Sequence, residues 1–245
     1  MKKLVTILLT NLLLLCSIFP SAVWAQQVIE PLSSEEVKEH YDEYFKLDSR
    51  LVNGDFYQTP NLSVASGHPY FISPEWKNGS VILEGDEFDN LLLRYDIHTG
   101  QIILNSAGFT NSAVQLVLKK DRIESFIMNG STFEPFPAHH SMTGLQFCEV
   151  LTEGEVDFLY VKSKNLKVSS SGLSDFAYTE YEDKFLRIGN DIISFKNRRT
   201  LYKHFPGLKT LLKEYVSENR LKFRSMDLAE QTRFISFCNI LLEEK

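Results

Sequence analysis

The sequence predicts a mainly β protein: an antiparallel meander that closes into a barrel or sandwich, with a short N-terminal helix and a C-terminal helical segment packed on the sheet. Two observations carry this prediction. Between about residues 51 and 195, short runs rich in β-branched and aromatic residues are broken at regular intervals by turn residues. From Asn197 to the C-terminus, apolar residues recur instead with helical spacing.

Residues 1–25 have the pattern of an export signal peptide. Two lysines precede an apolar run at residues 4–15, and small residues lead up to a cleavage site at Ala25. The run is shorter than the roughly 20 apolar residues that a membrane-spanning helix needs. Cys16 would allow lipid attachment, but Leu15 stands before it where a small residue is required. We therefore expect an exported chain, periplasmic or secreted, that is soluble after cleavage and keeps no transmembrane span.

The charge balance narrows the range of partners. The formal net charge of the 245-residue chain is -6, and loss of Lys2 and Lys3 with the signal makes it -8. An acidic chain argues against nucleic acid as a partner, because phosphate binding needs clustered Lys and Arg. It argues equally against docking on an anionic membrane.

The mature chain divides into two parts of one domain. Residues 26–195 form the β-rich part with its leading helix, expected at residues 34–47 after the capping residue Ser34. Residues 196–245 form the C-terminal helical segment. The predicted strands alternate apolar and polar side chains, and they span residues 80–84, 88–98, 101–105, 114–118, 123–128, 147–152, 156–161, 177–181, 184–188 and 191–195.

Turn residues separate these strands. Asn53-Gly54, Asn78-Gly79 and Asn129-Gly130 each favour a tight turn, since both residue types adopt positive φ at low cost. Residues 133–144 contain two prolines and are predicted to be an irregular loop that cannot be a central strand. The polar, Ser-rich residues 164–175 are predicted to be a flexible connection.

Three helices are expected at the C-terminus. Asn197 can cap a short helix that ends near His204, and Pro206 can begin the next one. Asp227 and Glu230 have the spacing of a capping box at the start of the last helix. The apolar stripes of these C-terminal helices should pack on the sheet.

A set of residues near the middle of the chain carries a resemblance. The set is Gly67-His68-Pro69-Tyr70-Phe71, Glu75-Trp76, Gly79, Val81, Gly85, Phe88 and Leu93-Arg94-Tyr95-Asp96-Ile97. In these positions, and in layout over most of the mature chain, the sequence resembles a family of uncharacterised secreted proteins common in Bacteroidota. The resemblance implies an envelope or secreted setting in a Gram-negative cell and no particular activity.

No catalytic or metal motif emerges from the sequence, and no cofactor is indicated. His139 and His140 could bind zinc together with His98 or Glu149, but no motif spacing fixes their geometry. Cys148 could be a nucleophile activated by one of these histidines, although its apolar neighbours indicate burial. The carboxylates Asp86, Glu87 and Asp89 could serve glycoside chemistry, but solvated acids are the commoner explanation.

Two further features could bind a ligand or stabilise the fold. Tyr70, Phe71 and Trp76 could form an aromatic platform for a sugar or peptide, with core packing as the alternative. Cys148 and Cys238 could form a disulfide in an oxidising compartment, with separate buried thiols as the alternative.

Three classes of function remain open at this point. The first is a non-catalytic envelope or secreted protein that binds a partner or ligand, and its partner is unknown. The second is a carrier that holds an apolar ligand inside a curled sheet. The third is a hydrolase that uses the loop with His139 and His140.

Overall fold

The computed structural model describes residues 48–60, 65–107, 113–137, 146–169 and 175–244. All of them belong to one compact unit that spans His40–Lys245. The predicted signal peptide and the predicted helix at residues 34–47 lie outside the described residues.

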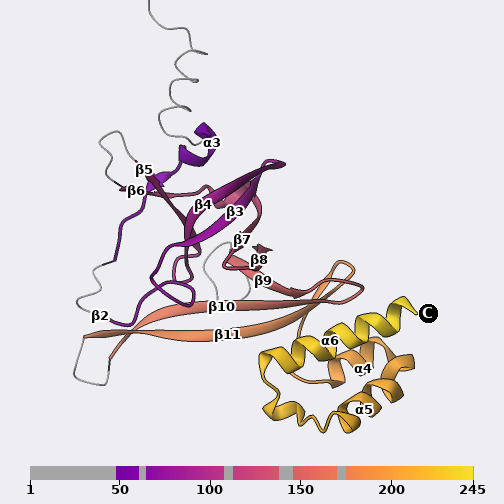
Figure 1. The fold of residues 1–245 in the computed structure, drawn as a ribbon. Coiled ribbons are helices and arrows are strands. Elements are labelled where there is room, and N and C mark those ends of the chain that lie inside the picture. The colour runs from indigo at the N-terminus through magenta and orange to yellow at the C-terminus, as the bar shows by residue number, and fades with distance from the viewer. Residues whose placement is uncertain (1–47, 61–64, 108–112, 138–145, 170–174, 245) are drawn as a thin grey trace, which may run out of the picture. The chain divides into compact units, whose positions relative to one another are not determined.

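A single sheet of 12 strands dominates the unit (Figure 1). The strands are β1 (Asp55–Phe56), β2 (Ala65–Ser66), β3 (Lys77–Leu83), β4 (Asp86–Asp96), β5 (Gln101–Ala107), β6 (Ala113–Val117), β7 (Ile123–Met128), β8 (Ser131–Phe136), β9 (Gln146–Thr152), β10 (Asp157–Val168), β11 (Phe176–Ile188) and β12 (Asp191–Ser194). Their order is β1-β6-β5-β4-β3-β7-β8-β9-β10-β11-β12, and β2 pairs in parallel with β11. The prediction of a mainly β, antiparallel fold is confirmed.

The predicted closure into a barrel or sandwich is wrong. Two antiparallel meanders, β3 to β6 and β7 to β12, join where β3 pairs with β7. In the described part of the chain, the terminal strands β1 and β12 do not pair with each other. Closure is unnecessary because the sheet covers its apolar face in two other ways, by curling on itself and by packing against the C-terminal helices.

The curl brings β4 against β9, although three strands separate them in the sheet. The Tyr95 hydroxyl accepts a hydrogen bond from the Phe147 N–H at 3.1 Å and donates one to the Phe147 carbonyl at 3.3 Å. Leu91, Leu93 and Tyr95 are buried while Leu92 is exposed, so the predicted alternation along β4 is confirmed. Aromatic rings fill the inner face, where Phe126 and Phe133 stack at 4.6 Å.

Residues 131–136 form strand β8 in the middle of the sheet, which corrects the prediction of an irregular loop there. β8 pairs with β7 over Ser131–Phe133 and with β9 over Phe133–Phe136. Pro135 is tolerated because it lies beyond the part of β8 that pairs with β7, where fewer ladder hydrogen bonds are needed. Residues 138–144 of the predicted loop are outside the described residues.

The longest hairpin also differs from the prediction. Lys164–Val168, predicted to be part of a flexible connection, continues β10, and Phe176–Ile188 is one unbroken strand instead of two. The pairing runs without a shift from Asp157↔Arg187 to Val168↔Phe176. Polar side chains misled the prediction because both faces of this hairpin are largely exposed near its tip, so no apolar alternation is required there.

Gly79 lies inside β3 and not in a turn, which corrects the prediction for Asn78-Gly79. The Asn129-Gly130 prediction is confirmed, since both residues have positive φ and join β7 to β8. Gly79 instead allows a close approach of two strands: a Cβ atom there would lie 2.1 Å from the carbonyl oxygen of Ile127.

We expect Gly79→Ala to lower the free energy of unfolding by about 1–3 kcal/mol, because the added methyl group forces β3 away from β7. Urea unfolding followed by circular dichroism measures this. Gly85→Ala is the control for loss of glycine itself, since a Cβ at Gly85 meets no atom within 4 Å, although its positive φ adds some strain of its own. A Gly79→Ala variant as stable as the parent protein would contradict the close approach.

The remaining elements are helical. They are α3 (Ser49–Val52), η2 (Lys120–Arg122), α4 (Arg199–His204), η3 (Pro206–Leu208), α5 (Lys209–Glu218), η4 (Phe223–Ser225) and α6 (Leu228–Glu243). The predicted capping box is confirmed, because the side chains of Asp227 and Glu230 each accept the other's backbone N–H. Buried residues of β10, β11, α5 and α6 form one shared apolar cluster, so the C-terminal helices pack on the sheet as predicted.

Candidate anion-binding site

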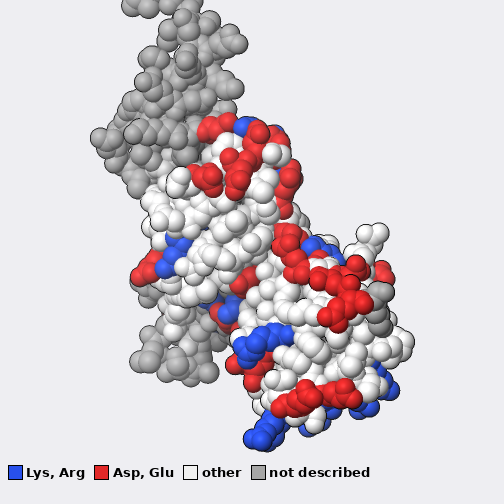
Figure 2. All heavy atoms as spheres, turned by 45° about the vertical axis from the view of Figure 1, so that its right-hand side comes forward, with Lys and Arg blue, Asp and Glu red and all other residues white. Residues whose placement is uncertain are grey.

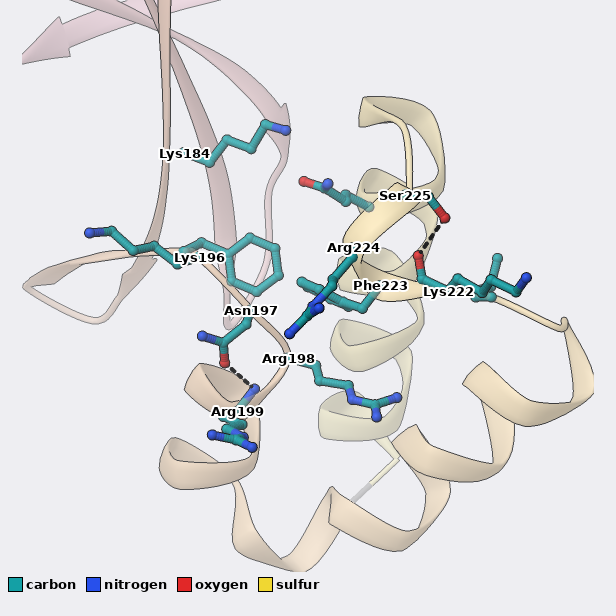
Figure 3. Close-up of a pocket in the computed structure, with 12 residues that line it drawn as sticks. Lys184, Lys196, Asn197, Arg198, Arg199, Lys222, Phe223, Arg224 and Ser225 are labelled. Carbon is teal, nitrogen blue, oxygen red and sulfur yellow. Dashed lines mark hydrogen bonds between the residues drawn. The ribbon is translucent and has the colours of Figure 1, made fainter.

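A pocket of about 970 Å³ lies beside the end of strands β11 and β12 and is bordered by the C-terminal helical segment (Figure 3). Three parts of the chain supply its walls: β11, the connection between β12 and α4, and the region from η4 to the start of α6. The lining residues are Lys184, Phe195, Lys196, Asn197, Arg198, Arg199, Leu221, Lys222, Phe223, Arg224, Ser225 and Gln231.

Half of these residues are cations, and none is an acid. The six are Lys184, Lys196, Arg198, Arg199, Lys222 and Arg224. Within the described residues, none of the six forms an ion pair with a carboxylate. Arg187, which lies on β11 as Lys184 does, is paired instead: it contacts Asp157 at 2.6 Å and Glu134 at 2.8 Å.

This concentration of positive charge stands out in an acidic chain. The net charge is -6, and Figure 2 shows both acidic and basic side chains on the visible face, including the part that carries the C-terminal helices. Five of the six cations are exposed and Lys184 is half-buried, so water and salt reduce the repulsion between them. An anion bound there would relieve that repulsion.

Backbone geometry fixes the strand side of the pocket. The N–H of Phe195 donates to the Lys184 carbonyl at 2.7 Å, which extends the β11–β12 ladder by one residue. The chain then turns, and the Asn197 side chain accepts the Arg199 N–H at 2.9 Å. The predicted cap is one residue off, because the N-cap residue of α4 is Arg198, whose side chain makes no capping hydrogen bond, and Asn197 precedes it. Lys184, Lys196, Arg198 and Arg199 therefore line the same pocket.

The helical side of the pocket is fixed in a similar way. In η4, both the N–H and the hydroxyl of Ser225 donate to the Lys222 carbonyl, at 2.8 and 3.1 Å. Gln231 is buried and donates to the Met226 carbonyl at 2.9 Å. These contacts hold Arg224 where its side chain points into the space between the two walls (Figure 3).

Aromatic rings form the floor. Phe195 and Phe223 meet edge to face with centroids 5.6 Å apart. Phe195 also contacts Phe158 of β10 at 5.5 Å, and Phe223 contacts Phe234 of α6 at 6.0 Å. The floor is therefore anchored in the apolar core on both sides.

The arrangement suits binding better than catalysis. Arginine and lysine donate hydrogen bonds and attract carboxylates and phosphates. Among the described residues, the pocket lining offers no carboxylate, imidazole or thiol that could act as a general base or nucleophile. Its one hydroxyl, Ser225, already donates to a backbone carbonyl.

The aromatic residues named from the sequence lie elsewhere. Tyr70 and Phe71 are buried, so they are packed in the protein and do not present a platform. Trp76 is half-buried, and the Arg94 guanidinium covers its ring at 3.9 Å while lying 4.5 Å from the Tyr70 ring. Arg94 therefore occupies the space between these two rings that a sugar would need.

The histidine and carboxylate candidates are not gathered into a site. His139 and His140 lie outside the described residues. His98 contacts the Lys164 carbonyl at 2.8 Å, and Glu149 accepts the Ser131 hydroxyl at 2.6 Å. Among the described residues, no cluster of three or more metal-ligating side chains occurs.

Cys148 and Cys238 are free thiols, so the disulfide considered from the sequence is not formed. Both are buried, but in different apolar clusters. Burial raises the pKa of Cys148 to about 12 and that of Cys238 to about 11. Neither is a thiolate at neutral pH, which argues against a nucleophilic role.

Residues of the resemblance set form a buried polar cluster. Asp96 occupies one of the polar positions in the alternation predicted for residues 88–98, but it is fully buried, where it accepts hydrogen bonds from the Tyr57 hydroxyl at 2.7 Å and the His98 N–H at 2.8 Å. Lys164 of β10 donates to the Tyr70 carbonyl at 2.7 Å, and burial lowers its pKa. Asp96 and Lys164 both have partners, although the Tyr70 hydroxyl and Arg94 Nε have none among the described residues, and we interpret the cluster as a brace between β4 and β10.

Sequence reasoning missed the basic pocket because its parts are far apart in the chain. Two local signals were available in this acidic chain: three of the four residues at 196–199 and three of the five residues at 220–224 are basic. Only the fold shows that these two segments and Lys184 face one pocket.

No helix in the described residues has the length and apolar character that crossing a membrane would require. No protein-family model, curated protein sequence or solved structure matches the chain. The resemblance to secreted proteins of Bacteroidota therefore stays a prediction, and the case for function depends on the geometry of the basic pocket.

Proposed function

We propose that this chain is an exported, non-catalytic binding protein that holds an anionic ligand in the basic pocket. The observation that carries the proposal is the set of six cations that line one pocket without a single carboxylate. A cluster of like charges raises the local concentration of ions of the opposite sign, which favours the binding of an anion there. The periplasmic or secreted setting follows from the predicted signal peptide that ends near Ala25.

The other two classes receive less support. A carrier of an apolar ligand needs an open interior, whereas the inner face between β4 and β9 is filled by rings such as Tyr95, Phe126 and Phe133 in mutual contact. The hydrolase alternative depends on His139 and His140, and no described residue supports it. A ligand-binding role is consistent with both the pocket and the absence of acid–base groups in its lining.

We expect pyrophosphate to bind the protein at low ionic strength and the double variant Lys184→Gln/Arg224→Gln to bind it at least tenfold more weakly. Two of the cations that point into the pocket are lost, and bound anions depend on such charges. Isothermal titration calorimetry measures the affinity. Added salt should weaken binding to the parent protein through screening.

A matched control separates the effect of losing pocket cations from the effect of lowering the net charge. Lys209→Gln/Lys213→Gln removes the same charge from exposed positions of α5 that do not line the pocket. This variant should bind pyrophosphate as the parent protein does. Equal loss of affinity in both double variants, or no binding to the parent protein, would contradict the proposal.

A further inference from the structure

We infer that the anionic ligand is an acidic polysaccharide, a linear chain of charged sugar units that continues past the basic pocket. This inference rests on the proposed function and specifies the class of ligand that the same pocket binds. Its basis is that exposed cations extend along both walls beyond the residues that line the pocket.

The C-terminal helical segment has the opposite charge from the rest of the mature chain. Residues 196–245 contain 11 basic and 6 acidic side chains, a net charge of +5, whereas residues 26–195 contain 13 and 26, a net charge of -13. Five of the six pocket cations belong to the basic part. Charge asymmetry of this kind indicates a surface for an anionic partner.

The first wall continues past the pocket along α4. Arg199 begins this helix and lines the pocket, and Lys203 follows four residues later. Residues four apart lie on the same face of a helix, about 6 Å apart along its axis. Lys203 is exposed and forms no ion pair within the part of the chain that the structure describes. A polymer that contacts Arg199 can therefore continue to Lys203.

The second wall continues in a similar way before η4. Leu221 and Phe223 are half-buried and pack on the core that the helices share with the sheet. The residues that alternate with them, Arg220, Lys222 and Arg224, are all exposed. Lys222 and Arg224 line the pocket, whereas Arg220 lies just outside its lining. This wall also presents a row of cations that is longer than the pocket.

Four of the six pocket cations are directed outward. Figure 3 shows Lys196, Arg198, Arg199 and Lys222 extending away from the middle of the pocket, while Arg224 points into the space between the walls. A small anion bound in the middle would leave the outward cations to solvent. A chain that crosses the pocket and leaves it can pair with them as well.

The shape and charge of the surroundings favour a thin partner. The cations line a concave pocket, which a flat membrane or a nucleic-acid duplex cannot enter. Glu182 and Asp183 are exposed and directly precede Lys184 in β11, so a broad anionic surface would also be repelled there. A single polymer strand can follow the cations alone.

The lining favours sugar units over nucleobases. Proteins hold single-stranded nucleic acid on exposed aromatic faces, where the bases stack. Phe195 is only 4% exposed, and it meets the half-buried Phe223 edge to face, so neither ring offers an open face. Asn197 and Ser225 add an amide and a hydroxyl to the lining, which can bond to the hydroxyl groups of a sugar. The half-buried Leu221 and Phe223 can contact the apolar side of a sugar ring.

The test compares decagalacturonate with galacturonic acid by calorimetry at one low ionic strength. The decamer can bind in more registers than a single unit, which alone accounts for a gain of about tenfold. We expect the decamer to bind at least a hundredfold more tightly per chain, since it also pairs with cations beyond the pocket. Single-stranded DNA of ten thymidines carries nearly the same charge, and it should bind at least tenfold more weakly than the decamer.

A double variant then tests the continuation beyond the pocket. Lys203→Gln/Arg220→Gln should weaken the binding of decagalacturonate at least fivefold and change the affinity for pyrophosphate less than twofold. Lys209→Gln/Lys213→Gln on α5 removes the same charge and should change neither affinity. Circular dichroism spectra that match the parent protein would show that both variants fold.

The outcomes separate this inference from the proposed function. If pyrophosphate binds but the decamer gains no more than tenfold over galacturonic acid, the pocket is an anion site and the polymer inference is wrong. The inference is also wrong if the thymidine decamer binds as tightly as decagalacturonate, or if Lys184→Gln/Arg224→Gln leaves the binding of decagalacturonate unchanged. If neither pyrophosphate nor decagalacturonate binds at low ionic strength, the inference and the proposed function are both wrong.

Discussion

Phe234→Ala is expected to lower the free energy of unfolding by about 3–5 kcal/mol, because it removes a fully buried ring from the core that joins the C-terminal helices to the sheet. The ring of Phe234 contacts those of Phe223 at 6.0 Å and Tyr215 at 6.1 Å. The α6 helix holds it by backbone geometry, so neighbouring side chains can fill the resulting cavity only in part. Urea unfolding, followed by circular dichroism and tryptophan fluorescence, measures the loss.

The same substitution should weaken the binding of anions, since Phe234 supports the pocket floor through Phe223. Phe237→Ala is the matched control. It removes a ring from the same helix, but that ring is half-buried and stacks on Tyr215 at 4.3 Å without contacting the floor. We expect Phe237→Ala to cost less than half as much stability and to leave anion binding unchanged. Equal losses in the two variants would contradict the placement of Phe234 in the shared core.

The fold class could be predicted because alternation and capping are local properties. Along β4, the burial of Leu91, Leu93 and Tyr95 follows directly from a side-chain period of two residues. The start of α6 follows from the spacing of Asp227 and Glu230, which the capping box requires. Neither inference needs information about the rest of the chain.

The errors arose where tertiary context overrides local preference. Pro135 would break a strand that is paired on both sides, but β8 is paired with β9 alone at that position. Gly79 was interpreted as a turn residue, yet it is required because the Ile127 carbonyl comes close to its Cα. In both cases the neighbouring strand decides the outcome, and single-sequence patterns do not show which strand that is.

The candidate site was harder to predict for the same reason. Lys184 is about a dozen residues from Lys196 and nearly 40 from Lys222, and no motif links the three. Their convergence depends on the β11–β12 ladder and on the docking of η4 and α6. Runs of charged residues indicate an interaction surface in general. Only the folded structure shows that Lys184 and the runs that contain Lys196 and Lys222 line one pocket.

Docking of α6 also depends on Asn239, a residue that the sequence did not single out. Asn239 lies on the buried side of α6 and reaches the loop between β9 and β10. Its side chain accepts the Val156 N–H at 2.9 Å and donates to the carbonyls of Val156 at 2.9 Å and Glu153 at 3.3 Å. The Asn239 side chain therefore supplies the hydrogen-bond partners that the backbone groups of this loop would otherwise lack.

Asn239→Ala is expected to lower the free energy of unfolding by about 2–4 kcal/mol, because the buried N–H and carbonyl of Val156 lose their partner. Urea unfolding measures the change, and faster hydrogen exchange at the Val156 amide should locate it. Ile240→Ala is the control, since it truncates the next residue of the same helix at an exposed position and should cost less than 1 kcal/mol. If Asn239→Ala costs no more than this control, water satisfies the loop and α6 docks through apolar contacts alone.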